Sequence, residues 1–265
     1  MSDLTTDQGC LVVLGGARGI GAEVAKIAAS SGRRCAVVDF SEVTMRFGYQ
    51  MGDIKSATYG DLEEKISRYG ADATNGADLA RIATQIQDDM GPIDQLAITA
   101  GAILGGKSLV ETSTQELLSM IDANLVVLHN AITSFIPLMK ETKERSSSAS
   151  IVAVVSVAAS KALGGIGAYC AAKGAMVAYL RTLALELAPD QINVNWVCPG
   201  STRGAMLDQS AVLYGLSDVE EFSIHHALGR LINPKEIAEA ISFLLSPAAS
   251  AITGAEIFVD AGMHL

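Results

Sequence analysis

Short apolar runs and longer amphipathic segments alternate along the whole chain. Runs in which nearly every position is apolar or β-branched predict strands buried on both faces, at residues 10–14, 34–39, 97–99, 150–156, 192–197 and 255–259, and a less regular strand is expected near 65–71. Between them, a helical period predicts helices at residues 19–30, 76–90, 114–143, 167–188 and 234–246. The alternation of strand and helix predicts an α/β fold: one domain over residues 1–265, with a doubly wound, seven-stranded parallel sheet and helices on both of its faces.

Two of the predicted helices carry a clear start signal. A capping box joins Ser113 to Glu116, and a second joins Asn233 to Glu236, with a proline at the first helical position. Residues 41–64, by contrast, show no clean period. A long connection of this kind is a lid, an oligomer contact or an ordinary surface insertion, and we favour the surface insertion.

Composition excludes several classes of protein. Hydrophobic residues make up 49% of the 265 and charged residues 18%, so the chain can build a large core. The net charge of −10 argues against nucleic acid or an anionic membrane as a partner. Charge-free stretches such as 123–139 contain Asn, His, Thr and Pro, which predicts no membrane-spanning helix. Residues 1–7 lack a basic segment followed by an apolar one, so we expect a cytoplasmic protein.

Cysteine and histidine spacing gives no sign of a metal site. There is no C-x-x-C pair and no H-x-x-x-H pair, so we expect neither a metal centre nor a redox dithiol. The adjacent pair His225-His226 is interpreted as an exposed helix end. The four cysteines are interpreted as small core residues: Cys10, Cys35, Cys170 and Cys198.

A glycine-rich turn between the first strand and the first helix indicates a dinucleotide site. Gly15, Gly19 and Gly21 allow the backbone to turn sharply and to approach a pyrophosphate, whose charge is favourable at a helix N-terminus. Asp39 ends the next strand, 18 residues after Gly21, where a carboxylate can accept both hydroxyls of a ribose. The same carboxylate would repel a 2′-phosphate by several kcal/mol at about 4 Å. Although Arg18 could bind such a phosphate, we expect NAD rather than NADP.

A tyrosine and a lysine four residues apart predict the catalytic centre. Tyr169 and Lys173 share one face of a helix, and a lysine ammonium beside a phenol favours the phenolate, which a general acid/base requires. Ser156 ends a buried strand at the carboxyl edge of the sheet, where its hydroxyl can bind a substrate oxygen.

Together these residues resemble the short-chain dehydrogenase/reductase family, a group of single-domain Rossmann-fold oxidoreductases. The resemblance covers essentially all of the chain, and its motifs occur in order: Gly15-x-x-x-Gly19-x-Gly21, Asp72-Ala73, Ala100-Gly101, Asn124, Ser156, Tyr169-x-x-x-Lys173 and Pro199-Gly200. It implies a catalytic tetrad in which Tyr169 is the acid/base, Ser156 polarises the carbonyl, Lys173 binds the nicotinamide ribose and Asn124 holds a relay water. It also implies these cofactor contacts: Gly15, Ala17, Arg18, Gly19, Ile20, Gly21, Asp39, Asp72, Ala73, Ala100, Gly101, Tyr169, Lys173, Pro199, Gly200 and Thr202.

The chain departs from the family pattern at three places. Leu14 replaces the usual threonine and Ile98-Thr99 replace the usual pair of asparagines, so we expect apolar packing beneath the cofactor loop. The threonine usually found four residues after Gly200 is also absent, which leaves Ser201 or Thr202 to contact the carboxamide. The terminal Asp260-Ala261-Gly262 resembles the family's last strand, which implies a homotetramer.

The sequence therefore predicts an NAD-dependent enzyme that interconverts a secondary alcohol, or a diol, and a ketone. Substrate choice is assigned to a loop at residues 203–229, whose apolar side chains indicate a mainly apolar small molecule. A cis-dihydrodiol dehydrogenase is the first alternative, and an acyl-carrier reductase is disfavoured. The alternative of another class is a non-catalytic NAD-binding sensor or scaffold, and an intermediate hypothesis is an enzyme that retains its NAD through residues 41–64.

Overall fold

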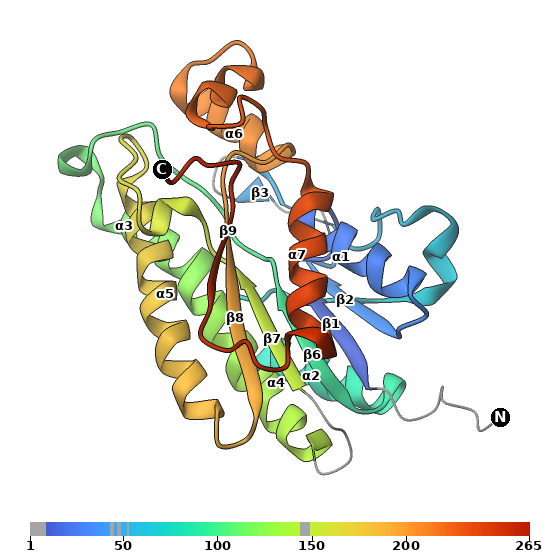
Figure 1. The fold of residues 1–265 in the computed structure, drawn as a ribbon. Helices are drawn as coiled ribbons and strands as arrows, with labels where there is room; N and C mark the ends of the chain where they lie inside the picture. The colour runs from blue at the N-terminus through green and yellow to red at the C-terminus, as the bar shows by residue number, and fades with distance from the viewer. Residues whose placement is uncertain (1–8, 43–44, 47–48, 52, 144–148) are drawn as a thin grey trace.

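One parallel sheet of seven strands organises the molecule. The computed structural model describes residues 9–42, 45–46, 49–51, 53–143 and 149–265. Residues 1–7, on which the expectation of a cytoplasmic protein rests, lie outside them. The strand order is β5-β2-β1-β6-β7-β8-β9, and every pair in the sheet is parallel (Figure 1). The strands are β1 (Cys10–Leu14), β2 (Cys35–Asp39), β5 (Ile66–Gly70), β6 (Ile93–Ile98), β7 (Ala149–Val154), β8 (Ile192–Pro199) and β9 (Glu256–Val259). This arrangement confirms the predicted doubly wound fold.

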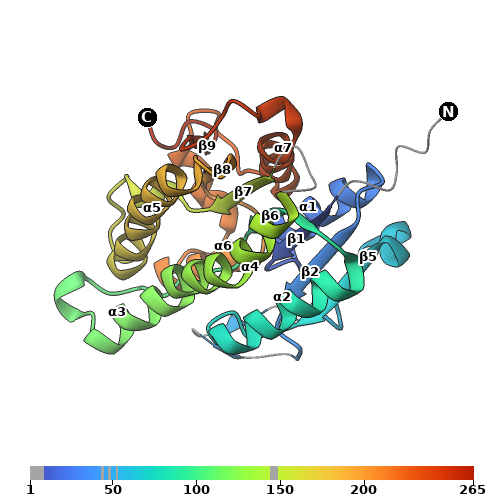
Figure 2. The same ribbon diagram turned by 90° about the horizontal axis from the view of Figure 1, so that it is seen from below.

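Helices cover both faces of the sheet (Figure 2). On one face lie α1 (Gly19–Ser30) and α7 (Pro234–Leu245), whose buried residues form one core cluster with the sheet. The other face is covered by α2 (Gly76–Met90), α4 (Val127–Lys143) and α5 (Gly167–Leu187), which form a second cluster. Both predicted capping boxes are present, at the start of α3 (Thr114–Ile121) and of α7.

The predicted helix at 114–143 is interrupted. A π turn over Asp122–Val126 separates α3 from α4. Within the described residues, the run Thr114–Glu141 is long and apolar enough to cross a membrane by length and composition, but 44% of its most apolar window is buried in the fold. A core helix passes the same test, and Leu128 and Phe135 of α4 are fully buried against the sheet.

Strand β6 begins earlier than its apolar run indicates. Strand β6 starts at Ile93, whereas the sequence predicts a strand only from residue 97. The difference arises from two buried polar residues: Asp94 forms an ion pair with Arg33, and the Gln95 side-chain amide donates to the Leu245 carbonyl at 2.7 Å. Their partners come from distant segments, so the local pattern is that of a polar turn.

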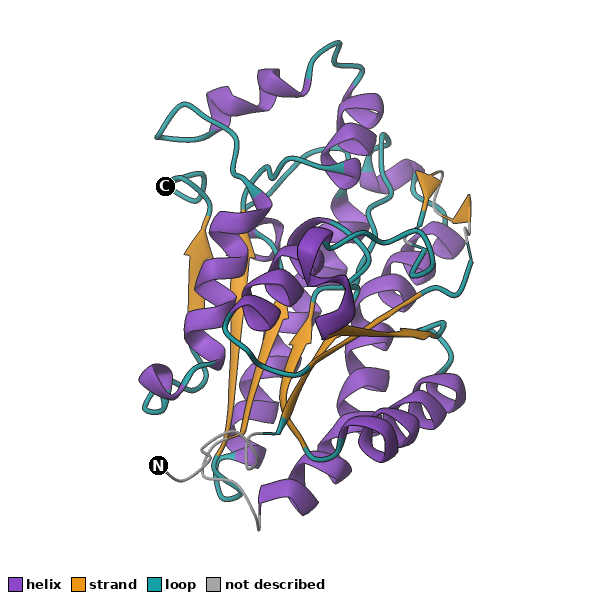
Figure 3. Cartoon of the chain, turned by 90° about the vertical axis from the view of Figure 1, so that its right-hand side faces the viewer, coloured by secondary structure: helices purple, strands orange, loops and turns teal. Residues whose placement is uncertain are grey.

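The carboxyl ends of all seven strands lie along one edge of the sheet (Figure 3). The chain order reverses between β1 and β6, because β1 connects outward to β2 while β6 continues toward β7. In sheets of this kind the crevice at such a reversal is the usual ligand site.

Two connections carry structure that the sequence did not predict. Residues 203–229 contain α6 (Ala205–Tyr214) and a 3-10 helix at Val219–His225, which pack together through Leu207 and Phe222. Residues 41–64 include a short antiparallel pair, β3 (Met45–Arg46) with β4 (Tyr49–Gln50), and a 3-10 helix at Gly60–Lys65. The described second half of the segment is anchored to the core by three buried side chains, Ile54, Ala57 and Tyr59, while half of residues 53–64 are exposed.

Candidate active site

The glycine turn after β1 leaves the N-terminus of α1 open. Gly15 has a φ of +87°, and a Cβ there would lie 2.6 Å from the backbone nitrogen of Ala100, while a Cβ on Gly21 would overlap the Gly15 carbonyl oxygen. A Cβ on Gly19 would meet nothing within 4 Å. The turn is therefore packed tightly from behind and open in front, which fits a pyrophosphate at the helix N-terminus. Ala17, Arg18 and Ile20 lie in this turn or the first turn of α1.

Asp39, at the end of β2, faces the same turn. One carboxylate oxygen accepts the Ala17 N–H at 3.0 Å and the other accepts the Phe40 N–H at 2.9 Å. Burial raises the pKa of this carboxyl, while the two hydrogen bonds and the charge of Arg18 lower it. Each carboxylate oxygen can accept a further hydrogen bond, so the position suits two ribose hydroxyls.

The turn after β5 lies beside this site and carries the residues assigned to adenine. Asp72 accepts hydrogen bonds from both the N–H and the hydroxyl of Thr74, and its own N–H donates to Asp78. The side-chain amide of Asn130 donates to the Ala73 carbonyl at 2.9 Å. These contacts fix the backbone of the turn between β5 and α2.

The expected apolar packing beneath the glycine turn is only partly correct. Leu14 and Ile98 are buried, as expected. The hydroxyl of Thr99, however, lies 2.9 Å from the Leu14 carbonyl oxygen and 3.1 Å from that of Gly15, so it ties β6 to the turn. A polar contact is kept here because the Gly15 carbonyl faces the protein interior and needs a donor.

Asn124 and Lys173 meet beside Gly101, at the carboxyl end of β6. A Cβ built on Gly101 would lie 2.8 Å from Asn124 Oδ1 and 3.4 Å from Lys173 Nζ. The Asn124 amide nitrogen donates to the carbonyls of Ala102 and Met120, both at 3.0 Å. Asn124 Oδ1 is buried and has no hydrogen-bond partner among the described residues. The π turn that carries Asn124 is a feature often found at functional sites.

Tyr169 and Lys173 extend this cluster from α5. Both side chains are buried, and Lys173 Nζ lies 5.6 Å from the centroid of the Tyr169 ring. The ammonium donates to the Val154 carbonyl at 3.2 Å. Burial lowers the pKa of Lys173 to about 8, although the nearby Cys198 opposes this effect.

Ser156 lies two residues beyond the end of β7, and the predicted strand at 150–156 is therefore too long at its end. Its hydroxyl oxygen accepts the Ala158 N–H at 3.1 Å and caps a 3-10 turn at Val157–Ala159. The hydroxyl proton remains available to donate to a substrate oxygen.

The segment after β8 is held by a histidine that the sequence analysis misinterpreted. Pro199 ends β8, and the Thr202 hydroxyl donates to the Gly200 carbonyl at 3.0 Å. His226 is 4% exposed, and its Nε2 accepts the Ser201 N–H at 3.1 Å. Only His225 of the pair is exposed, so the exposed-helix-end interpretation is wrong for His226.

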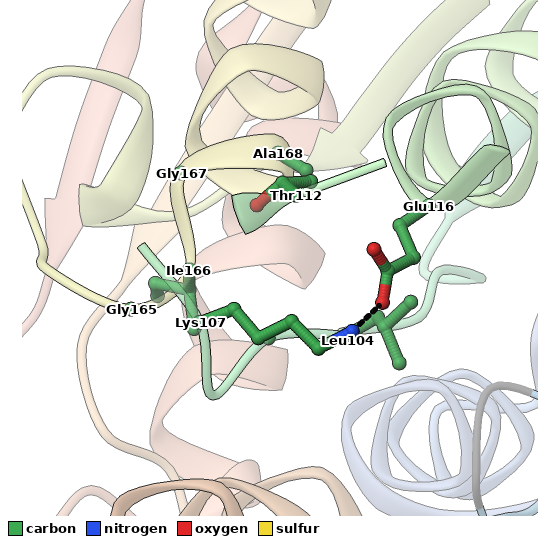
Figure 4. Close-up of a pocket in the computed structure, with 9 residues that line it drawn as sticks. Leu104, Lys107, Thr112, Glu116, Gly165, Ile166, Gly167 and Ala168 are labelled. Carbon is green, nitrogen blue, oxygen red and sulfur yellow. Dashed lines mark hydrogen bonds and ion pairs between the residues drawn. The ribbon is translucent and has the colours of Figure 1, made fainter. Parts of the chain in front are cut away.

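A small hollow adjoins the first turn of α5, and Lys107 and Glu116 form an ion pair of 2.6 Å beside it (Figure 4). None of the four tetrad residues lines this hollow. Leu104 lines the hollow, and with Leu213 and Met51 it also packs against the apolar cluster that contains Tyr169. The tetrad residues therefore lie outside the hollow but next to residues that border it.

Comparison with known proteins places these residues in a family. The model described as "Enoyl-(Acyl carrier protein) reductase" matches residues 15–264. A 3-oxoacyl-[acyl-carrier-protein] reductase of Mus musculus is 32% identical over 96% of this chain and 97% of its own. A 2,3-dihydro-2,3-dihydroxybenzoate dehydrogenase of Bacillus subtilis is 31% identical over 96% of this chain and 95% of its own.

A solved structure extends the comparison to three dimensions. Carveol dehydrogenase from Mycobacterium avium, solved in complex with NAD, has a TM-score of 0.89 and 25% identity, and the match covers 98% of both chains. The range that the family model matches, residues 15–264, spans the glycine turn, the four predicted tetrad residues and the last strand. The chain belongs to the short-chain dehydrogenase/reductase family of oxidoreductases.

Proposed function

We propose that the protein is an NAD-dependent oxidoreductase that interconverts a secondary alcohol and a ketone, with Tyr169 as the acid/base. The observation that carries the proposal is that Asn124 Oδ1 and Lys173 Nζ both lie next to Gly101, with the Tyr169 ring 5.6 Å from the same ammonium. A buried cation and a buried amide oxygen without a partner both lower the stability of a folded protein. They have a use at a site where a proton is transferred, because they can stabilise a phenolate and bind a water.

The chain's residues fit NAD. Gly19 faces open space at the N-terminus of α1, and both oxygens of Asp39 can accept further hydrogen bonds there. Asp39 supports NAD over NADP, because its carboxylate would lie close to a 2′-phosphate. When bound, the nicotinamide would accept or donate the hydride. Lys173, Gly200 and Thr202 would hold the nicotinamide half, and Asp72 and Ala73 the adenine.

The proton is handled by the tetrad. In the oxidative direction the Tyr169 phenolate takes the proton of the substrate hydroxyl, and the Ser156 hydroxyl donates to the same substrate oxygen. At 5.6 Å, the Lys173 ammonium attracts a charge on the tyrosine by about 3 kcal/mol at an effective dielectric of 20. Asn124 Oδ1 is available to a relay water, since it has no partner among the described residues.

We propose a substrate that is small and mainly apolar. Leu104 and Leu213 pack against the apolar cluster that contains Tyr169, and they come from the turn after β6 and from α6. The similarity to 2,3-dihydro-2,3-dihydroxybenzoate dehydrogenase and to carveol dehydrogenase supports an alcohol or a cis-dihydrodiol. The similarity to a 3-oxoacyl-[acyl-carrier-protein] reductase makes a ketoacyl substrate the alternative to be screened.

Residues 41–64 favour a variant of this function in which the enzyme retains its NAD. The Tyr59 hydroxyl donates to the Gly16 carbonyl at 3.0 Å, beside the phosphate turn. Met51 packs against the cluster that contains Tyr169. The described parts of the segment thus contact the phosphate turn and the apolar cluster that contains Tyr169. NAD in the purified protein would support retention.

We also propose a homotetramer in the cytoplasm, with neither nucleic acid nor membrane as a partner. Strand β9 is an edge of the sheet, and the neighbouring Phe243 of α7 is 50% exposed, which suits a contact between copies. The net charge of −10 supports the absence of nucleic acid. Light scattering after gel filtration tests the tetramer.

Two measurements test the function. Titration with NADH and NADPH at one salt concentration should show tighter binding of NADH, and a screen of secondary alcohols, dihydrodiols and ketoacyl thioesters should reveal turnover. Tyr169→Phe should bind NADH as the wild type does and lose turnover. Turnover by this variant would refute the acid/base assignment, and NADH binding without any turnover by the wild type would favour a sensor or scaffold.

A further inference from the structure

We infer that His226 is a positioning residue for the cofactor site: its neutral ring holds the backbone at Ser201, and a proton on that ring releases it, so that NADH binding weakens in acid. The inference rests on the proposed cofactor site. It assigns a role to a residue outside the tetrad and outside the glycine turn.

The ring of His226 lies against the turn that leaves β8. Nε2 accepts the Ser201 N–H at 3.1 Å, and Nδ1 lies 3.2 Å from the Phe222 carbonyl oxygen. A Cβ on Gly200 would lie 2.9 Å from Nε2 and 3.1 Å from the Asp260 carbonyl oxygen. Glycine at position 200 therefore gives the imidazole the space to reach the backbone.

The two hydrogen bonds fix the tautomer. A backbone N–H is only a donor, so Nε2 must present a lone pair to Ser201. A carbonyl is only an acceptor, so Nδ1 must carry the proton that faces Phe222. A second proton would have to go on Nε2, where it would face the Ser201 N–H. The contact can form only while His226 is neutral.

The charged and titratable groups around the ring do not reverse this preference. Burial lowers the pKa of His226, and the charge of His225 acts in the same direction. Asp260 and the hydrogen bonds to backbone act against it. The Asp260 carboxylate itself accepts hydrogen bonds from the N–H and the ring of His264 and from Gly262, so its charge is already engaged.

The histidine holds one side of a short segment that is tied on its other side as well. The Ile232 N–H donates to the Ser201 carbonyl at 3.1 Å, and the Arg203 N–H donates to the Ile232 carbonyl at 3.0 Å. The segment contains Thr202, which we assign to the nicotinamide half of the site. Loss of the His226 contact removes one of the hydrogen bonds that hold this segment, so Thr202 is then positioned only by the contacts with Ile232 and Gly200.

The test compares NADH binding across pH in variants of the two neighbouring histidines. His226→Gln keeps a side-chain oxygen as an acceptor for Ser201 but cannot take a proton near neutrality. His226→Leu removes the acceptor. His225→Gln is the matched control, because His225 is exposed. Binding is followed by energy transfer from the single tryptophan, Trp196 of β8, to NADH.

We expect the wild type and His225→Gln to lose NADH affinity in acid, at a pH below the ordinary histidine value of about 6.5, because burial lowers the pKa of His226. His226→Gln should bind like the wild type at pH 8 and lack this acid step. His226→Leu should bind about five- to tenfold more weakly at pH 8, the effect of one hydrogen bond. An acid step that persists in His226→Gln, or unchanged affinity in His226→Leu, would overturn the inference.

Failure of the proposed function can be distinguished from failure of the inference about His226. If the wild type does not bind NADH at pH 8, the cofactor assignment is wrong, whatever the histidine does. The stability of the cofactor-free protein, measured by unfolding at several pH values, then still tests whether the folded state requires a neutral His226. Because the folded-state pKa lies below that of the unfolded chain, the wild type should lose stability relative to His226→Gln as the pH falls below about 6.5. If the stability of the wild type and of His226→Gln depended equally on pH, the requirement for a neutral His226 would be refuted.

Discussion

Replacing Lys173 with methionine should make the cofactor-free protein more stable and inactive. The ammonium is buried, and burial lowers its pKa from 10.5 to about 8. At about 1.36 kcal/mol for each pKa unit, the charged lysine destabilises the folded state by about 3 kcal/mol. Methionine has a similar length without the charge, and it loses only the hydrogen bond to the Val154 carbonyl, about 1 kcal/mol.

The net gain of about 2 kcal/mol should raise the melting temperature by about 4–8 °C for a domain of this size. The gain depends on pH in a defined direction. Below pH 8 both the folded and the unfolded wild type hold the proton, so the cost of the charge is constant. Between about 8 and 10.5 only the unfolded chain holds it, so wild-type stability rises with pH and the advantage of Lys173→Met shrinks.

Calorimetry of the cofactor-free wild type, Lys173→Met and Lys235→Met checks this prediction. Lys235 is exposed at the start of α7, so its replacement should change the melting temperature little. The reasoning is wrong if Lys173→Met is no more stable than the wild type at pH 7, or if its advantage is unchanged at pH 10. Substantial turnover by Lys173→Met would contradict the role of the ammonium in catalysis.

Three further substitutions test the cofactor crevice. Asp39→Ala should reduce the preference for NADH over NADPH at least tenfold in paired titrations, because the carboxylate that repels a 2′-phosphate is gone; an unchanged ratio would place Asp39 away from the ribose. Gly21→Ala should lower stability by about 1–3 kcal/mol in urea unfolding, because the new methyl overlaps the Gly15 carbonyl oxygen; wild-type stability would show that the turn can relax. Tyr59→Phe should cost about 1 kcal/mol of stability and should weaken NADH binding, because the hydrogen bond to the Gly16 carbonyl is lost. If stability and NADH affinity were both unchanged, residues 41–64 would have no role in holding the cofactor turn.

Most of the fold could be predicted because its elements have local signals. Strand β1 and helices α1 and α2 begin and end where the apolar period begins and ends. The failures occur where the signal is not local. Strand β6 carries Asp94 and Gln95, which are polar in sequence and become satisfied only by Arg33 and the Leu245 carbonyl.

Helix α6 was missed for a different reason. Its apolar residues fall on several sides, so no face can be recognised, and it packs mainly against the following 3-10 helix through Leu207 and Phe222. Neither element packs against the main core, and the buried apolar side chains of each pack mainly against the other. A pattern taken one helix at a time cannot show this.

The site could be predicted in part because its residues stand at strand ends. Parallel strands bring their carboxyl ends to one edge, so Asp39 and Ser156 follow from the fold. Lys173 follows from its spacing to Tyr169. Asn124, by contrast, is known from the family pattern alone, and His226 gave no signal, because a histidine beside a second one in a polar stretch is usually exposed. Only the return of residues 219–226 to the end of β8 buries its ring.

The cost of this site bears on whether the protein is a catalyst or a scaffold. The Lys173 ammonium is buried, and Asn124 Oδ1 is buried without a partner among the described residues. Both features lower the stability of the cofactor-free fold, and both lie beside Gly101. A protein that only bound NAD could replace the lysine with an apolar side chain and become more stable. A large stability gain in Lys173→Met would therefore show a fold that keeps a costly group at its crevice, as proteins do where the group has a function. If Lys173→Met were no more stable than the wild type, this argument against a scaffold would no longer hold.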